Sequence, residues 1–182
     1  MPPGENVGHG MPLSDDFSSS TLGIQWTYGR NINPDEFFRP SNGRLSMKAS
    51  FGFPTNATTL SVMPVNHAYE AEVELSIPDT AEGGLMLSSG KGSGSRATVG
   101  LRKAEAFAIW GRVDNYIKWN GNHIFVLLRN NRGDVSCYYS TDGKQWTPFE
   151  NSTGVSGARR LSLYAAGEGE VVFRNFKYRV LE

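Results

Sequence analysis

Apolar and polar residues alternate along much of the chain, and short runs of Gly, Asn and Asp separate the alternating stretches. A period of two places successive side chains on opposite sides of an extended strand. No stretch carries the capped apolar stripe of helical period. The clearest alternating segments are residues 45–49, 69–75, 97–101 and 106–112. The pattern therefore predicts an all-β protein.

Two parts of the chain predict hairpins, because turn residues join their apolar runs. Between residues 123 and 149, N-N-R-G-D and T-D-G-K separate three runs, which predicts three consecutive antiparallel strands. Near the C-terminus, G-E-G-E separates L-S-L-Y-A-A from V-V-F-R-N-F-K-Y-R-V, which predicts another hairpin. So many short strands in one domain predict two packed antiparallel sheets, a β-sandwich or jelly roll.

Composition supports this prediction and removes two classes of partner. The chain has 182 residues, about the length of one domain, and its 21 glycines suit strands joined by tight turns. It carries 18 basic and 18 acidic residues, so it lacks the overall charge that attracts nucleic acids or anionic membranes. No run approaches the roughly 20 apolar residues that span a bilayer. We therefore expect neither a nucleic acid nor a membrane as partner.

Three glutamates, Glu70, Glu72 and Glu74, alternate with apolar residues in segment 69–75. Residues two apart share a strand face, so we expect these carboxylates on the polar face, with neighbours about 6.6 Å apart and the outer pair about 13 Å apart before side-chain reach. Spacing of this order is compatible with the roughly 6.5–9.5 Å between the carboxyl groups of inverting glycosidases. Segment 69–75 also resembles the E-x-D-x-E-like strand of family-16 glycoside hydrolases, although Glu72 replaces the central Asp. A hydrated face or groove wall is favoured, because glutamates are common on such faces.

Strand parity also predicts exposed aromatic residues. If Phe107 and Ile109 face inward, then Trp110 and Arg112 face outward. By the same rule Tyr138 faces outward, with Cys137 among its inward neighbours.

Aromatic rings stack on the apolar faces of sugars, while amide, carboxylate and guanidinium groups bond to hydroxyls. The segment N-Y-I-K-W-N-G adds candidates of both kinds. The alternative is that these rings belong to the core. The predicted sugar-binding residues are Trp110, Tyr138 and Tyr116 as stacking platforms, with Arg112, Glu72 and Asn115 as hydroxyl partners.

Four ordered segments resemble a known domain: M-P-L-S-D-D-F-S-S-S-T-L-G-I-Q-W, G-G-L-M-L-S-S-G, Y-Y-S-T-D-G-K-Q-W and V-V-F-R-N-F-K-Y-R. They resemble the concanavalin A-like C-terminal domain of family-43 glycoside hydrolases, which include β-xylosidases and α-L-arabinofuranosidases. The resemblance implies a linker remnant over residues 1–11 and a concanavalin A-like β-sandwich, a jelly roll, over residues 12–182. It also implies a non-catalytic accessory module that binds xylan, arabinoxylan or xylo-oligosaccharides beside a catalytic propeller that these residues do not contain.

The resemblance has two further implications. In some β-xylosidases of the family, a Phe on a loop of this domain reaches the active site of the propeller. The corresponding segment here offers only Phe149 near its start, so we do not expect that role. Related domains also hold a structural calcium near their termini, which implies Asp15 and Asp16 as ligands, with Asn175 where relatives tend to have Asp. No other cofactor is expected.

The sequence thus predicts a weak sugar-binding module, with dissociation constants on the order of 0.1–1 mM. Two alternatives stay open. One is a structural domain that packs on a propeller and binds no sugar, for which an exposed apolar patch would be the sign. The other is a family-16-like hydrolase that uses Glu70 and Glu74.

Overall fold

The computed structural model describes residues 12–51, 56–89, 96–111, 113–150, 153–155, 157 and 160–181. The linker predicted over residues 1–11 lies outside this part. The described chain forms strands and one four-residue helix. In chain order the elements are α1 (Pro34–Phe37), β1 (Phe38–Ser41), β2 (Arg44–Lys48), β3 (Thr58–Val62), β4 (Ala68–Ser76), β5 (Ala81–Ser88), β6 (Arg96–Arg102), β7 (Glu105–Trp110), β8 (Val113–Lys118), β9 (His123–Asn131), β10 (Asp134–Ser140), β11 (Thr147–Pro148), β12 (Thr153–Gly154), β13 (Arg160–Gly167) and β14 (Glu170–Val180).

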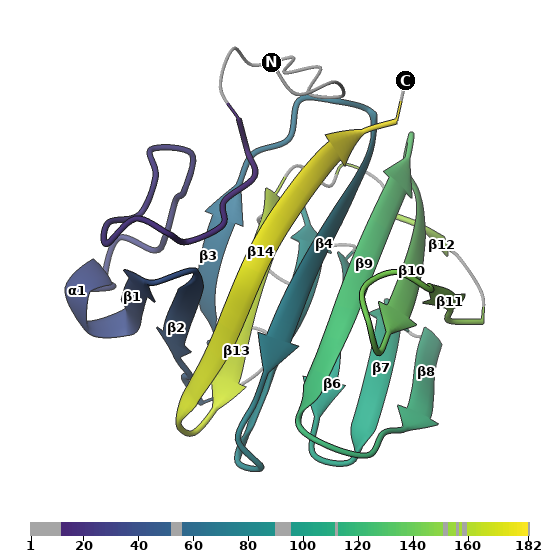
Figure 1. The fold of residues 1–182 in the computed structure, drawn as a ribbon. Coiled ribbons are helices and arrows are strands. Elements are labelled where there is room, and N and C mark those ends of the chain that lie inside the picture. The colour runs from purple at the N-terminus through teal and green to yellow at the C-terminus, as the bar shows by residue number, and fades with distance from the viewer. Residues whose placement is uncertain are drawn as a thin grey trace.

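Two antiparallel sheets pack face to face (Figure 1). The eight-stranded sheet has the order β1-β2-β14-β4-β9-β10-β11, with β12 also paired to β10. The six-stranded sheet has the order β3-β13-β5-β6-β7-β8. The predicted all-β sandwich is therefore confirmed. The described residues include no helix long and apolar enough to cross a bilayer.

The predicted hairpins have mixed outcomes. Strands β9, β10 and β11 pair consecutively, as expected. The C-terminal prediction is wrong, because β13 and β14 lie in different sheets and their turn carries the chain across the sandwich. Its ends are held by other segments: the N–H of Gly167 donates to Ser50 O, and the N–H of Glu168 donates to Thr80 O. Turn residues allow either connection, so their presence alone does not specify a hairpin.

The main core lies between the sheets, where alternate residues of both point inward. In β4 the inward residues are Tyr69, Ala71, Val73 and Leu75, all buried as predicted. The inward set is apolar and the outward set is acidic, so the face on which each side chain of β4 lies could be predicted from the sequence.

The outer face of the six-stranded sheet carries a second apolar cluster of Met86, Phe107 and Tyr164. Tyr164 is aligned with Gly84, which is aligned with Gly100 on the next strand. A Cβ on Gly100 would lie only 2.9 Å from the hydroxyl of Tyr164. The two glycines thus make room for a tyrosine on the outside of the sheet, so this face is not simply a polar one.

Candidate functional site

The three glutamates of β4 are all paired with basic side chains from the flanking strands β9 and β14. Antiparallel register causes this, because Glu70 stands directly opposite both Arg129 and Arg179. The pairs are Glu70 with Arg129 and Arg179, Glu72 with Lys177, and Glu74 with His123 and Arg174.

Glu70 differs from expectation, because its side chain is only 3% exposed although it lies on the outer face. Arg129 donates to Glu70 Oε2 from Nε at 3.0 Å and from Nη2 at 2.9 Å, and Arg179 pairs with Oε1. The arginine side chains cover the carboxylate. Both of its oxygens are therefore engaged by guanidinium groups, which does not suit a carboxylate that must reach a substrate.

Trp110 does not face outward, contrary to prediction. It is 2% exposed and lies in the core between the sheets with Ala106 and Ala108, while Phe107 and Ile109 face the outer side. The prediction assumed that Phe107 and Ile109 of β7 face inward. It failed because the outer face of this sheet has its own apolar cluster. Trp110 is therefore not available as a stacking platform.

Asn115 also points to the core side, because it is aligned with Ala108 across β7 and β8. Within the described part of the chain, neither Asn115 Nδ2 nor Trp110 Nε1 has a hydrogen-bond acceptor, although both atoms are buried. Arg112, the guanidinium predicted to bind hydroxyls, lies outside the described residues.

Tyr116 faces outward on β8 and is 42% exposed. Its hydroxyl donates to Asp114 Oδ2 at 3.1 Å, and partial burial together with this bond raises its pKa. The guanidinium of Arg102 lies 4.7 Å from the centre of the Tyr116 ring and 5.6 Å from that of Phe107. Arg102 is itself held by Glu105, to which its Nε donates at 2.8 Å. This is an exposed aromatic ring with an oriented cation beside it.

Arg102 also lines a pocket of about 350 Å³ at one end of the six-stranded sheet. Burial raises the pKa of Glu82 in this pocket, and the charge of Arg102 partly opposes that effect. The other polar side chains of the lining are Asp79, Thr80 and Lys103. We call this pocket, together with Arg102 and Tyr116, the Arg102 site.

Tyr138 faces outward as predicted, but on the opposite sheet. Its ring lies 5.3 Å from the guanidinium carbon of Arg129, and its hydroxyl accepts from Ser136 Oγ at 3.3 Å. Glu72 lies on the same outer face. The predicted binding residues that the structure describes are thus not brought together: Tyr138 and Glu72 lie on the outer face of one sheet, Tyr116 on that of the other, and Trp110 and Asn115 on the core side.

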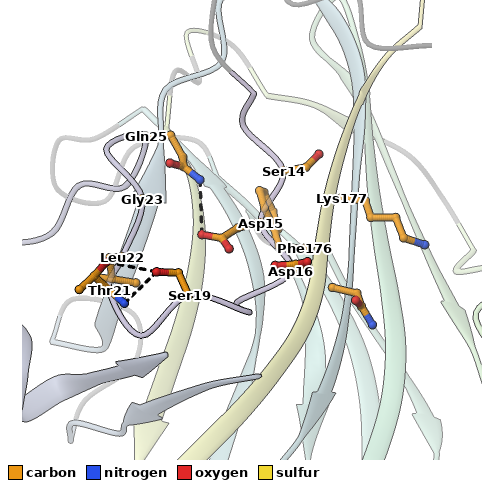
Figure 2. A pocket seen from close by; sticks show the side chains of 11 residues that line it. Ser14, Asp15, Asp16, Ser19, Thr21, Leu22, Gly23, Gln25, Phe176 and Lys177 are labelled. Carbon is orange, nitrogen blue, oxygen red and sulfur yellow. Dashed lines mark hydrogen bonds between the residues drawn. The ribbon is translucent and has the colours of Figure 1, made fainter. Parts of the chain in front are cut away.

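A larger pocket of about 490 Å³ lies between the N-terminal segment and β14 (Figure 2). Asp15 fixes this segment, because its Oδ1 accepts from the N–H of Phe17 at 2.8 Å and its Oδ2 from Trp26 Nε1 at 2.7 Å. Gln25 approaches the same carboxylate in Figure 2, with Nε2 at 3.4 Å from Oδ2. The Asp15 carboxylate thus holds a buried indole in place.

Asp16 lies in the same pocket and is exposed. Hydrogen bonds from Ser18 lower its pKa, and one of them runs from Ser18 N to Oδ1 at 2.9 Å. Calcium takes six to eight oxygens, and the described residues hold no cluster of three or more acidic, His or Cys side chains. Asp15 and Asp16 supply only part of such a set. Calcium binding there stays a prediction that requires carbonyl groups and water as further ligands.

Sequence reasoning missed Arg102 and Glu82, and it placed Phe149 only as a possible loop residue. Arg102 and Tyr116 are distant in sequence but are joined by the register of β6, β7 and β8. The available signal was L-R-K-A-E, where a short turn brings Arg102 opposite Glu105. Phe149 is buried and packs against Tyr139 at 4.9 Å, so it is a core residue.

No family model and no curated protein matches this chain, whereas solved structures do. The GH43 protein BlXynB from Bacillus licheniformis matches with a TM-score of 0.78 and 18% identity over 92% of this chain and 39% of that chain. A GH43 glycoside hydrolase with an engineered active site, described as displaying endo-xylanase and exo-arabinofuranosidase activity, matches with a TM-score of 0.75 and 14% identity. That match covers 100% of this chain and 43% of the other.

The sandwich has the fold of part of these GH43 chains. The chain spans about two fifths of their length. A putative glycosyl hydrolase from Parabacteroides distasonis is also similar, with a TM-score of 0.62, 10% identity, and coverage of 87% of this chain and 89% of that one. At these identities the likeness shows the fold, and the site must supply the argument for function.

Proposed function

We propose that this chain is a non-catalytic carbohydrate-binding module that binds xylan or arabinoxylan and belongs to a family-43 glycoside hydrolase. The likeness to part of GH43 chains supports the association with such an enzyme. The paired state of Glu70, Glu72 and Glu74 speaks against a family-16-like hydrolase. Binding is assigned to the Arg102 site.

One observation carries this assignment: an exposed ring and a polar pocket share Arg102. The guanidinium lies over the ring of Tyr116 and also lines the pocket that contains Glu82 and Thr80. A sugar ring stacked on Tyr116 would place its hydroxyls near carboxylate, guanidinium and hydroxyl groups, which are suitable partners for them. Because the site is open, it would bury little area and bind weakly.

Affinity electrophoresis tests the proposal, with gels containing xylan, arabinoxylan, β-glucan or no polysaccharide. We expect xylan or arabinoxylan to retard the parent chain and Tyr116→Ala to weaken binding roughly two- to tenfold, from the loss of about 0.5–1.5 kcal/mol of ring stacking. Tyr28→Ala is the matched control, because Tyr28 is 43% exposed and packs on Phe38, away from the Arg102 site. Equal retardation of Tyr116→Ala and the parent would reject the Arg102 site.

A reducing-end assay on the same samples tests the absence of catalysis. We expect no sugar release from any of the polysaccharides. Release that disappears in Glu70→Gln would overturn the non-catalytic assignment in favour of a hydrolase.

A structural domain that packs on a catalytic propeller is the second candidate. Exposed apolar side chains on the two segments that the bridge between Thr27 and Ser61 joins favour it, because such groups suit a protein interface. These side chains are Ile24 and Met63. The absence of retardation in every gel would support this candidate over sugar binding.

A further inference from the structure

The outer face around β4 is layered by charge. Its carboxylates lie close to the sheet, and the basic side chains of β9 and β14 lie above them. The exposed fractions of the side chains are 3% for Glu70, 20% for Glu72 and 19% for Glu74, against 44% for Arg129, 35% for Arg174, 65% for Lys177 and 63% for Arg179. We call these seven residues the β4 face. A molecule that approaches it meets cations first.

The strand order places these cations on both sides of the glutamates. Strand β4 lies between β14 and β9 in the sheet (Figure 1). Lys177 and Arg179 are two residues apart on β14, so their Cα atoms are about 6.6 Å apart along the strand. Arg129 stands across β4 from Arg179, with Glu70 between them. The basic groups therefore form a two-sided array rather than one isolated charge.

These cations retain donors beyond the bonds that they make to the glutamates. Arg129 bonds to Glu70 through Nε and Nη2, and a guanidinium has five N–H groups. Lys177 donates to Glu72 Oε1 at 2.6 Å, and an ammonium has three N–H groups. Four basic side chains of this face lie above three carboxylates, and the exposed carboxylate of Asp16 lines a pocket with Lys177. The spare donors of the exposed cations suit carboxylate groups, which arginine binds through paired hydrogen bonds.

We propose that the β4 face binds a polysaccharide that carries uronic-acid carboxylates. This is a second binding surface on the opposite sheet from the Arg102 site, and it does not depend on the neutral-sugar function proposed there. Tyr138 extends the face with an aromatic ring beside Arg129, where the apolar side of a sugar can lie.

The spacing of charge favours a uronate polymer over a nucleic acid. Double-stranded DNA carries one charge per ~1.7 Å of its axis, whereas Lys177 and Arg179 are separated by about 6.6 Å along their strand. The glutamates beneath would repel a dense polyphosphate, and the whole chain has no net charge that would offset this. A polymer with at most one carboxylate per sugar matches the sparse cations better.

Affinity electrophoresis of the full chain in gels with polygalacturonate tests this proposal. We expect retardation in about 20 mM salt that is largely lost in about 300 mM salt, because salt screens exposed charges. Lys177→Gln should weaken binding severalfold. Glu72→Gln should strengthen it severalfold, because it removes the carboxylate beneath Lys177 and frees that ammonium. Lys144→Gln is the control for loss of one exposed positive charge, since Lys144 lies in the turn between β10 and β11.

Lys177→Gln should weaken binding and Glu72→Gln should strengthen it, and these opposite effects distinguish a role in binding from a role in stability. A merely structural ion pair would be weakened by either substitution, so a loss of binding in both Glu72→Gln and Lys177→Gln would reject the proposal, as would no change in either. Thermal unfolding of each variant checks that it is folded at the temperature of the gel. Tighter binding of a DNA oligonucleotide than of polygalacturonate would also overturn the proposal. Tyr116→Ala should leave polygalacturonate binding unchanged. The proposal for the β4 face and the proposal for the Arg102 site can therefore fail independently of each other.

Discussion

The carboxylate of Asp15 joins the N-terminal segment to the sandwich through the buried indole of Trp26. In Asp15→Ala the indole N–H loses this acceptor, so we expect the free energy of unfolding to fall by about 1–3 kcal/mol. Urea unfolding measures this, and Asp16→Ala, which removes an exposed carboxylate from the same pocket, should change stability much less. Equal losses would show that the indole contact is not the cause. Calcium that raises the midpoint for the parent but not for Asp16→Ala would confirm the calcium prediction.

The direction in which single residues point could be predicted only where the two faces of a strand differ in polarity. The faces of β4 are acidic and apolar, so its inward residues were correctly predicted. On β7 both faces are apolar, and the small residues Ala106 and Ala108 face the core while Phe107 faces outward. The two faces of β7 therefore do not differ in polarity, and Trp110 was placed on the wrong side. The Arg102 site was missed for a related reason, since it depends on an outer face that the sequence pattern does not distinguish.

Strand pairing in the six-stranded sheet depends on glycine where β5 and β6 meet. A Cβ on Gly84 would overlap the carbonyl oxygen of Val99, so the strands would have to separate. We expect Gly84→Ala to lower the free energy of unfolding by about 1–3 kcal/mol or to prevent folding. Gly154→Ala is the control, because a Cβ there meets nothing within 4 Å. Chemical unfolding and the yield of folded protein measure the effect, and a Gly84→Ala variant as stable as the parent would show that the sheet relaxes freely.

At the scale of elements, local patterns predicted most strands but not every partner. The turn after β9 leads to a paired neighbour, whereas the turn after β13 leads to the other sheet. Both contain glycine and polar residues, and the difference arises from distant contacts such as that of Gly167 N with Ser50 O. Local sequence does not encode these contacts, so the choice between hairpin and crossover is made by packing of the whole sandwich.

The two proposed surfaces lie on the outer faces of opposite sheets, so the whole molecule would present them in opposite directions. One chain of a polysaccharide that contains both neutral xylose and uronic acid could not easily reach both, whereas two chains could each occupy one surface. We therefore expect the parent protein to cross-link glucuronoxylan and to raise its light scattering. Tyr116→Ala and Lys177→Gln should each reduce this scattering, while their effects on affinity should add to within about 0.3–0.5 kcal/mol, because distant sites act independently. A larger coupling between the two substitutions would show a shared site and contradict the assignment of two surfaces.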